Sequence, residues 1–301
     1  MKILILGVGG MLGSTLARYL SSKQGLQVVG SSRSNEDINF LNSNGNLELI
    51  YGLDVTNSSS LEDLIRNVTP NLIINCVGII KQDPQAHDPL KVILLNSLFP
   101  HELSLLCERF NSRLIHISTD CVFSGRKGGY LEADFCDCDD LYGRSKCLGE
   151  VLASANTITL RTSIIGHELF SNYSLLEWFL SQSTFVQGYS RAVFSGLTTL
   201  EIAKVIFNFV LPNTGLAGLY HLSSHPIDKY SLLNKIARVY GKDLTINVDD
   251  RLVIDRSLDS SKFRISTKWS PPSWDQMIEE MKSDFIALKN LRMGMSNYVS
   301  R

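Results

Sequence analysis

Residues 1–13 read Met-Lys-Ile-Leu-Ile-Leu-Gly-Val-Gly-Gly-Met-Leu-Gly, and this stretch decides the fold. The first six residues are an apolar run typical of a buried parallel strand, and a helical apolar stripe follows the glycines. Gly7 permits a tight turn, Gly10 lets backbone amides approach a pyrophosphate, and Gly13 lets the helix pack against the sheet. A strand, a glycine turn and a helix in this order predict a dinucleotide site rather than a plain turn. The expected cofactor contacts of this turn are Gly7, Gly9, Gly10, Met11, Leu12 and Gly13.

Strand and helix patterns alternate as far as residue 163. Such alternation predicts a parallel sheet with helices on both faces. We expect a Rossmann-type doubly wound sheet in residues 1–163 and a smaller mixed α/β substrate-binding lobe mainly in residues 164–301, some of which return to the first domain. The predicted strands are 2–6, 26–30, 48–51, 72–77, 114–118 and 157–163, and the predicted helices of this part are 11–22, 60–68, 90–109 (kinked at Pro100) and 142–154.

Tyr142 and Lys146 stand four positions apart and so share one face of a predicted helix. The lysine charge is expected to lower the pKa of the phenol from about 10, so that it can act as an acid or base. Thr119 offers a hydroxyl to the same substrate oxygen, and Asp120 helps to fix that loop. The alternative is a surface tyrosine beside a solvated lysine.

The end of the second predicted strand bears on the choice of cofactor. An NAD-type site places Asp or Glu here to hold the ribose hydroxyls, but the strand is followed by Ser31-Ser32-Arg33. Arg33 offers a planar cation to a ribose phosphate, and Ser32 adds a hydroxyl. The sequence therefore predicts NADP (NADPH) as the preferred cofactor, with NAD as the second choice. A solvated surface arginine is the alternative.

Several segments, in this order along the chain, resemble the dTDP-4-dehydrorhamnose reductase branch of the extended short-chain dehydrogenase/reductase family. They are the glycine spacing G-x-x-G-x-x-G, Ile115-His-Ile-Ser-Thr-Asp-Cys-Val-Phe-Ser-Gly125, Leu141-Tyr-Gly-Arg-Ser-Lys-Cys-Leu-Gly-Glu150, Leu160-Arg-Thr-Ser163 and Gly218-Leu-Tyr-His-Leu222. The resemblance implies an NAD(P)-dependent oxidoreductase that reduces a nucleotide-linked 4-keto-6-deoxysugar in dTDP-rhamnose and polysaccharide biosynthesis. A nucleotide-sugar epimerase or dehydratase and a non-catalytic dinucleotide-binding regulator remain as alternatives.

The same resemblance assigns roles to further residues. It implies that Tyr142 donates the proton, that Lys146 tunes Tyr142 and holds the nicotinamide ribose, and that Thr119 hydrogen-bonds the substrate oxygen. Asn96 supports the lysine in many relatives, although a structural role is an equal alternative. Further cofactor contacts are expected from Asp54, Val55, Cys76, Val77 and Gly78.

Two departures from the branch concern the substrate. Gly196-Leu-Thr-Thr199 replaces the usual Gly-x-Pro-Thr, and Cys121 replaces a common tyrosine. We expect both positions to lie near the sugar. The loss of the proline and of the tyrosine would then reshape the pocket, so that it admits a larger analogue such as an N-acetylated sugar. An ordinary rhamnose-pathway substrate is the alternative. The expected substrate contacts are Cys121, Val122, Phe123, His167 and Arg256, with a surface position as the alternative for His167.

Composition limits the remaining classes. The formal net charge is −1, which does not favour nucleic acid or an anionic membrane as partner, and no run of 18 apolar residues predicts a membrane span. The N-terminus predicts a strand rather than a signal peptide, so a cytoplasmic protein is expected. The six cysteines lack paired C-x-x-C spacing, so no metal is expected, although Cys136-Asp137-Cys138 leaves a redox switch or a soft-metal site as an alternative. The oligomeric state is left open, with a homodimer as the candidate.

Overall fold

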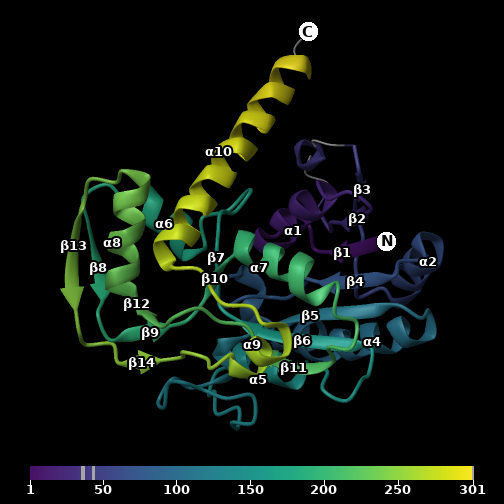
Figure 1. The fold of residues 1–301 in the computed structure, drawn as a ribbon, viewed down its shortest axis with the longest axis horizontal. Helices are drawn as coiled ribbons and strands as arrows, with labels where there is room; N and C mark the ends of the chain where they lie inside the picture. Colours follow the sequence, from purple (N-terminus) through teal and green to yellow (C-terminus); the bar gives the residue numbers. More distant parts are fainter. Residues whose placement is uncertain (35–37, 43–44, 300–301) are drawn as a thin grey trace.

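The computed structural model describes the backbone of residues 1–34, 38–42 and 45–299 and the side chains as far as residue 290. Seven parallel strands form one sheet in the order β11-β6-β5-β4-β1-β2-β3 (Figure 1). The order turns back on itself beside β1, as in a doubly wound Rossmann sheet, and the predicted fold class is confirmed. The strand bounds are β1 Lys2–Leu6, β2 Gln27–Ser31, β3 Leu47–Ile50, β4 Leu72–Asn75, β5 Arg113–Thr119, β6 Thr157–Thr162 and β11 Gly218–His221.

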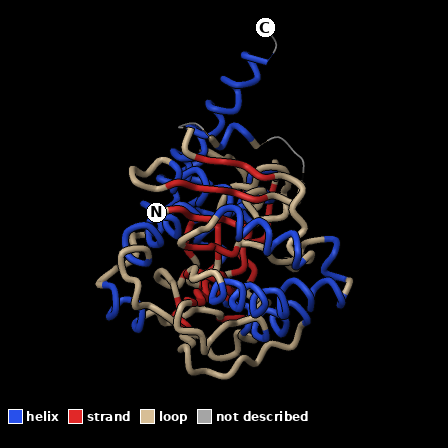
Figure 2. Tube along the Cα trace, turned by 90° about the vertical axis from the view of Figure 1, so that its right-hand side faces the viewer, coloured by secondary structure: helices blue, strands red, loops and turns tan. Residues whose placement is uncertain are grey.

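Helices cover both faces of this sheet, which explains why the central strands β1 and β4 consist mainly of apolar residues (Figure 2). Side chains of β1 alternate between two cores, with Ile3 and Ile5 in one and Leu4 and Leu6 in the other. The first core also contains residues of α1 (Met11–Ser21), α7 (Thr199–Val205) and α10 (Trp274–Val299), and the second contains residues of α2 (Ser58–Val68) and α4 (Phe99–Arg109).

The predicted helix 90–109 is present, and its interruption is a π-helical segment. The helical stretch consists of α3 (Pro89–Ile93), the π-helical segment η3 (Leu94–Leu98) and α4. Pro100 lacks an N–H and its ring would clash with the carbonyl four residues earlier, so a wider turn just before it relieves the conflict. By length and composition this is the one described helix that could cross a membrane; in the structure it packs against β5 and α5 (Leu141–Leu148).

The helix predicted over 142–154 ends early. Gly149 is the C-terminal cap of α5, and a Cβ built on it would lie 1.9 Å from the Asn96 carbonyl oxygen. This close approach fixes where α5 meets the π-helical segment, and it therefore fixes the position of α5 relative to the sheet.

Residues after 163 form small sheets and helices on one side of the large sheet. Two-stranded and three-stranded sheets pair segments that are distant in sequence, such as β8 with β13, while β11 joins the large sheet beside β6. The helix α10 runs out from the body of the molecule (Figures 1 and 2). The remaining bounds are β7 Ile164–Ile165, α6 Leu175–Ser181, β8 Phe185–Tyr189, β9 Ala192–Phe194, β10 Leu197–Thr198, β12 Ile227–Asp228, α8 Lys229–Tyr240, β13 Thr245–Asp249, β14 Ile254–Asp255 and α9 Ser261–Thr267.

Candidate active site

The glycine turn between β1 and α1 leaves backbone amides free to bind an anion. Gly7 has a φ of +89°, which side chains rarely allow, and its N–H donates to the Ser31 carbonyl at 2.9 Å. A Cβ on Gly13 would lie 2.2 Å from the Gly7 carbonyl oxygen, so only glycine lets α1 approach the turn this closely. Gly10 is the N-cap of α1 and makes no side-chain cap, so the first amides of the helix are available to a phosphate.

The ends of β2 and β3 lie on one side of this turn. A Cβ on Gly9 would lie 3.3 Å from the Ser32 hydroxyl, so Ser32 sits against the turn, and Arg33 beyond it is exposed. The exposed Asp54 accepts hydrogen bonds from the Thr56 N–H and hydroxyl at 2.9 and 2.7 Å. These bonds, and then the Arg33 charge, lower the pKa of the Asp54 carboxyl. The Val55 side chain packs in the second core instead, which leaves only its backbone for a cofactor.

On the other side of the turn, the loop after β4 is tied to the catalytic helix by Asn96. The Asn96 side chain accepts from the Ile79 N–H and donates to the Ile79 carbonyl, both at 2.9 Å. It also donates to the Ser145 hydroxyl at 3.2 Å. A Cβ on Gly78 would lie 3.2 Å from Asn96 Oδ1 and 3.9 Å from Lys146 Nζ, so these predicted residues come together.

Cys76 and Val77 are the first residues of the same loop after β4. A Cβ on Gly7 would lie 3.2 Å from the Val77 side chain and 3.3 Å from the Cys76 carbonyl carbon, which puts both residues beside the glycine turn. The Val77 N–H donates to Asn75 Oδ1 at 3.0 Å and so ends β4 earlier than predicted. Burial raises the pKa of the Cys76 thiol to about 12, which keeps it neutral.

Thr119, Tyr142 and Lys146 meet where β5 ends. Tyr142 lies one helical turn before Lys146 on α5, and its phenol lies close enough to the Thr119 side chain for Thr119 to influence its pKa. Thr119 also accepts from the Cys121 N–H at 3.1 Å and donates to Asp120 Oδ1 at 3.2 Å. The site therefore presents a phenol and a hydroxyl side by side at the carboxyl edge of the sheet, where ligands of open α/β sheets bind.

The predicted net lowering of the Tyr142 pKa is wrong in this structure. Burial is the largest influence on the phenol, and the nearby Cys121 adds to it, so the pKa of Tyr142 is raised. Lys146 is itself buried, and burial lowers the pKa of its ammonium to about 8. The phenol is therefore neutral near pH 7, which suits a proton donor.

Positive groups surround the Asp120–Cys121 segment. Burial raises the pKa of the Asp120 carboxyl, while the charges of Lys229 and Arg256 oppose this rise. Burial, followed by Asp120, raises the pKa of the Cys121 thiol to about 12, against the charges of Arg256 and Lys81. Arg256 Nε donates to the Phe123 carbonyl at 2.8 Å, and its Nη1 lies 3.9 Å from the Cys121 sulfur. Cys121 and Arg256 thus lie at the site, as the sequence predicted.

Three predicted substrate contacts lie elsewhere. Val122 and Phe123 are fully buried and belong to a separate small core, where Phe123 stacks on Tyr130, so neither is open to a ligand in this structure. His167 is also buried, with Nδ1 2.5 Å from Glu177 Oε1 and Nε2 2.7 Å from the Tyr240 hydroxyl. Both ring nitrogens of His167 are occupied, and its ring stacks on Phe285.

The segment 196–199 does not form an open wall of the pocket. Thr198 is 1% exposed and caps α7 through its hydroxyl, and the Thr199 hydroxyl accepts from Thr15 of α1 at 3.2 Å. The threonine that replaces proline therefore serves as a helix cap, which a proline side chain cannot do. The expectation that this replacement enlarges the sugar pocket is wrong.

Sequence reasoning missed Lys81 and Lys229. Lys81 Nζ lies 2.6 Å from Asp140 Oδ2 and 5.7 Å from the Tyr142 ring centroid. A signal for Lys81 existed, because it follows β4 at the carboxyl edge of the sheet. Lys229 starts α8, and no motif around it indicates that it approaches Asp120.

Comparisons with known proteins agree with this geometry. Residues 1–245 match the family described as RmlD substrate binding domain. The dTDP-4-dehydrorhamnose reductase of Aggregatibacter actinomycetemcomitans is 29% identical over 234 residues, which cover 75% of this chain and 74% of the relative. A crystal structure of a hypothetical dTDP-4-dehydrorhamnose reductase from Sulfolobus tokodaii superposes with a TM-score of 0.73 at 26% identity and covers 91% of this chain and 98% of that one. The dTDP-4-dehydrorhamnose reductase of Bacillus anthracis, solved with NADP, superposes with a TM-score of 0.75 at 18% identity, which shows a shared fold, and covers 94% of this chain and 99% of that one.

Proposed function

Because the chain belongs to the RmlD substrate binding domain family, we propose that it is an NADPH-dependent reductase of a nucleotide-linked 4-keto-6-deoxysugar. The first candidate substrate is dTDP-4-dehydrorhamnose, on which the named relatives act. The observation that carries this proposal is the placement of a neutral Tyr142 phenol beside the Thr119 side chain at the carboxyl edge of the sheet, with Lys146 one helical turn away. A product of this activity enters dTDP-rhamnose and polysaccharide biosynthesis.

The glycine turn and the loop after β4 fit a dinucleotide. A Cβ at Gly7 or Gly13 would fill the space between the turn and its neighbours, so this space depends on glycine. The start of α1 has no side-chain cap and offers its amides to the pyrophosphate. The exposed Arg33 suits the ribose phosphate of NADPH, since no acidic residue follows β2 directly. Gly78 and Lys146 would lie along the nicotinamide end, and NADPH, when bound, supplies the hydride there.

Tyr142 and Thr119 act on the substrate oxygen. The neutral phenol donates its proton to the oxygen as negative charge develops there, and the Thr119 hydroxyl donates a second hydrogen bond. Lys146 Nζ donates to the Ile117 carbonyl at 2.8 Å, so its charge stays at a fixed place one helical turn from Tyr142. This charge stabilises the phenolate that remains after proton transfer. Asp120, which accepts from the Thr119 hydroxyl in the structure, keeps this loop in place.

The cations near Cys121 suit the diphosphate of a nucleotide sugar. Lys229 and Arg256 both act on the Asp120 carboxyl, and Lys81 acts on the Cys121 thiol. Two positive groups, Lys229 and Arg256, thus face one carboxylate that burial drives toward its neutral form, while Lys81 is paired with Asp140. The surplus of positive charge favours an anionic ligand beside the proton donor.

Measurement of NADPH consumption with dTDP-4-dehydrorhamnose tests the proposal. Steady consumption of one NADPH per sugar reduced supports a reductase. An epimerase with the same side chains would convert the sugar without net consumption, and a regulator would bind NADPH without turnover. Either outcome, in a folded protein that binds NADPH, would contradict the proposed reaction.

Assembly and location are part of the same proposal. We propose a homodimer that buries the exposed apolar side chains along Pro89–Arg109 and α5, among them Leu90, Leu105 and Leu148, which are 81%, 65% and 67% exposed. Residues from 164 onward supply the substrate lobe, apart from segments such as β11 that join the large sheet. Six free cysteines suit the reducing cytoplasm, and no nucleic acid or membrane is needed as partner. Sedimentation of the purified chain tests the dimer.

A further inference from the structure

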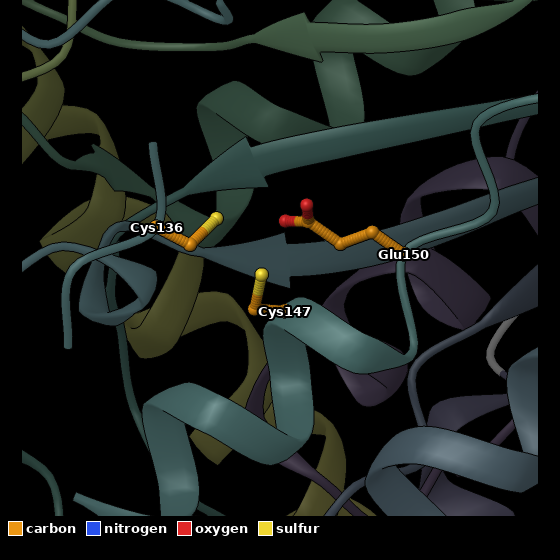
Figure 3. A group of neighbouring side chains, drawn as sticks. All are labelled: Cys136, Cys147 and Glu150. Carbon is orange, nitrogen blue, oxygen red and sulfur yellow. The ribbon is translucent and has the colours of Figure 1, made fainter. Parts of the chain in front are cut away.

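Two cysteine thiols face one another beside the catalytic helix, outside the residues assigned above. Cys147 follows Lys146 on α5, and Cys136 lies in the loop that leads into this helix. Their sulfur atoms and a carboxylate oxygen of Glu150 all lie within 4.8 Å of one another. Figure 3 shows the two thiol groups directed toward each other. Both cysteines are partly exposed, so solutes have access to them.

A fixed positive charge lies at this cluster. Arg161 binds both oxygens of Glu150, with Nε 2.7 Å from Oε1 and Nη2 2.6 Å from Oε2, and Nη2 also donates to the Cys136 sulfur at 3.3 Å. The Ser118 hydroxyl also donates a hydrogen bond to Glu150 Oε1 at 2.7 Å. A metal ion at these three atoms would meet the guanidinium and would have to displace the partners of Glu150. The pairing of Arg161 with Glu150 therefore disfavours a bound cation, and it offsets part of the Glu150 charge that opposes a thiolate on Cys147.

The two thiols are not equivalent. The two sulfur atoms lie within 4.8 Å of each other, and their interaction raises the pKa of Cys136 and lowers that of Cys147. Since the thiolate is the reactive form, Cys147 is the nucleophile and Cys136 is its resolving partner. Cys138, two residues after Cys136, differs from Cys147 because burial raises the pKa of its thiol.

We propose that Cys136 and Cys147 are a reversible dithiol–disulfide pair, oxidised by a hydroperoxide such as hydrogen peroxide. The Cys147 thiolate attacks one peroxide oxygen, the O–O bond breaks, and the leaving hydroxide takes up a proton to form water. Cys147 is then a sulfenic acid. The Cys136 sulfur attacks the Cys147 sulfur, the S–S bond forms, the S–O bond breaks, and the leaving hydroxide takes the Cys136 proton to form a second water.

The electrons in this step balance. Two thiols lose two electrons, one peroxide gains them, and two waters leave. The sulfur atoms must approach from within 4.8 Å to about 2.05 Å, a movement that rotation of two short side chains and a small shift of the loop can supply. A dithiol reductant reverses the step by thiol–disulfide exchange.

Treatment of the full chain with hydrogen peroxide, followed by peptide mapping without reduction, tests the pair. In the wild type we expect one cross-linked peptide that joins Cys136 to Cys147, and its loss after addition of dithiothreitol. With Cys136→Ser, a sulfenic acid should accumulate on Cys147 and be trapped by dimedone. With Cys147→Ser, oxidation of Cys136 should be slower by about tenfold or more, since its thiolate fraction is small.

The matched control is Cys138→Ser, which removes a neighbouring thiol of the same loop. It should form the Cys136–Cys147 cross-link at the wild-type rate. A thermal melt of each reduced variant shows that it is folded, and the wild-type peptide map tests the pair without any substitution. A cross-link between Cys138 and Cys147, no cross-link at all, or faster sulfenic acid formation on Cys136 than on Cys147 would overturn the proposal. So would stoichiometric Zn²⁺ binding that is lost in both Cys136→Ser and Cys147→Ser.

Discussion

Lys146 Nζ donates a 2.8 Å hydrogen bond to the carbonyl oxygen of Ile117 in the neighbouring strand β5. This bond fixes the ammonium group in a buried position where, among the residues that the structure describes, no carboxylate is hydrogen-bonded to it. Burial therefore lowers the pKa of Lys146 to about 8, although Glu150 and Cys76 act in the opposite direction. The lysine is charged below this pH and neutral above it, so its charge is lost within the range of an ordinary assay.

The first prediction follows from this lowered pKa. The kcat/KM of the reductase should fall as pH rises through about 8, because Lys146 then loses the charge that stabilises the phenolate. A pH profile of kcat/KM measures this directly. Lys146→Arg keeps a permanent charge and should move the alkaline limb upward, even if its absolute rate is lower. If the alkaline limb of the wild-type profile lay near the ordinary lysine pKa of about 10.4, the prediction would be contradicted.

The second prediction concerns Tyr142 as the proton donor. Tyr142→Phe removes only the hydroxyl, so turnover should fall by about 10²-fold or more, in line with the usual contribution of a positioned acid. The dissociation constant for NADPH should change little, which a fluorescence titration can check. Thr119→Val is the matched comparison, since it removes the neighbouring hydroxyl at similar volume. Near-normal turnover of a folded Tyr142→Phe variant would remove Tyr142 from its role.

Local sequence patterns predicted six of the seven strands of the large sheet, because short strand patterns alternate with helical stripes as far as residue 163. The seventh strand, β11, could not be predicted as part of this sheet, since it returns to the sheet only after the first part of the lobe. The lobe could not be predicted in this way. β8 pairs with β13 across about sixty residues of chain, and a period of two or 3.6 says nothing about such distant partners. Lys229 comes from this lobe, and its approach to Asp120 depends on the same long-range packing.

The site residues likewise divide into those that local sequence patterns predict and those that depend on burial and long-range packing. Thr119, Tyr142 and Lys146 could be predicted because one strand end and one helix face carry them. The direction of the Tyr142 pKa shift could not, because spacing gives the charge of a neighbour but not the degree of burial. His167 shows the converse error: its place after a strand predicts a substrate contact, but both its ring nitrogens are bound in a buried network.

The third prediction concerns cofactor choice. NADPH should be preferred over NADH, and Arg33→Ala should narrow the ratio of the two specificity constants by about tenfold to a hundredfold, the worth of one charge-assisted hydrogen bond of roughly 1.5–3 kcal/mol. Arg126 is likewise exposed but lies in the loop after β5, so Arg126→Ala is a matched control that should leave the ratio unchanged. Equal specificity constants in the wild type, or an unchanged ratio in Arg33→Ala, would contradict this assignment.

The fourth prediction concerns Asn96, which is fully buried. Asn96→Ala leaves the Ile79 N–H and carbonyl without their partners, so the free energy of unfolding should fall by about 2 kcal/mol or more, since each unsatisfied buried group costs about 1–3 kcal/mol. Ser97→Ala is the control. It removes one donor to the Ser145 carbonyl, which also accepts from the Gly149 N–H, and should cost about 1 kcal/mol or less. Urea unfolding compares the two, and equal losses would count against the bridging role of Asn96.

The last prediction concerns the glycine turn. A Cβ on Gly13 would lie 2.2 Å from the Gly7 carbonyl oxygen and 2.8 Å from its carbonyl carbon, and backbone atoms cannot move aside as a side chain can. Gly13→Ala should therefore push α1 away from the turn, lower the free energy of unfolding by about 1–3 kcal/mol, and weaken NADPH binding, because the helix amides move with it. Gly215→Ala is the matched control, since the nearest atom to its Cβ would lie 3.9 Å away. Urea unfolding and an NADPH titration give the two readouts, and a Gly13→Ala protein that matches Gly215→Ala in both would show that α1 does not need this glycine.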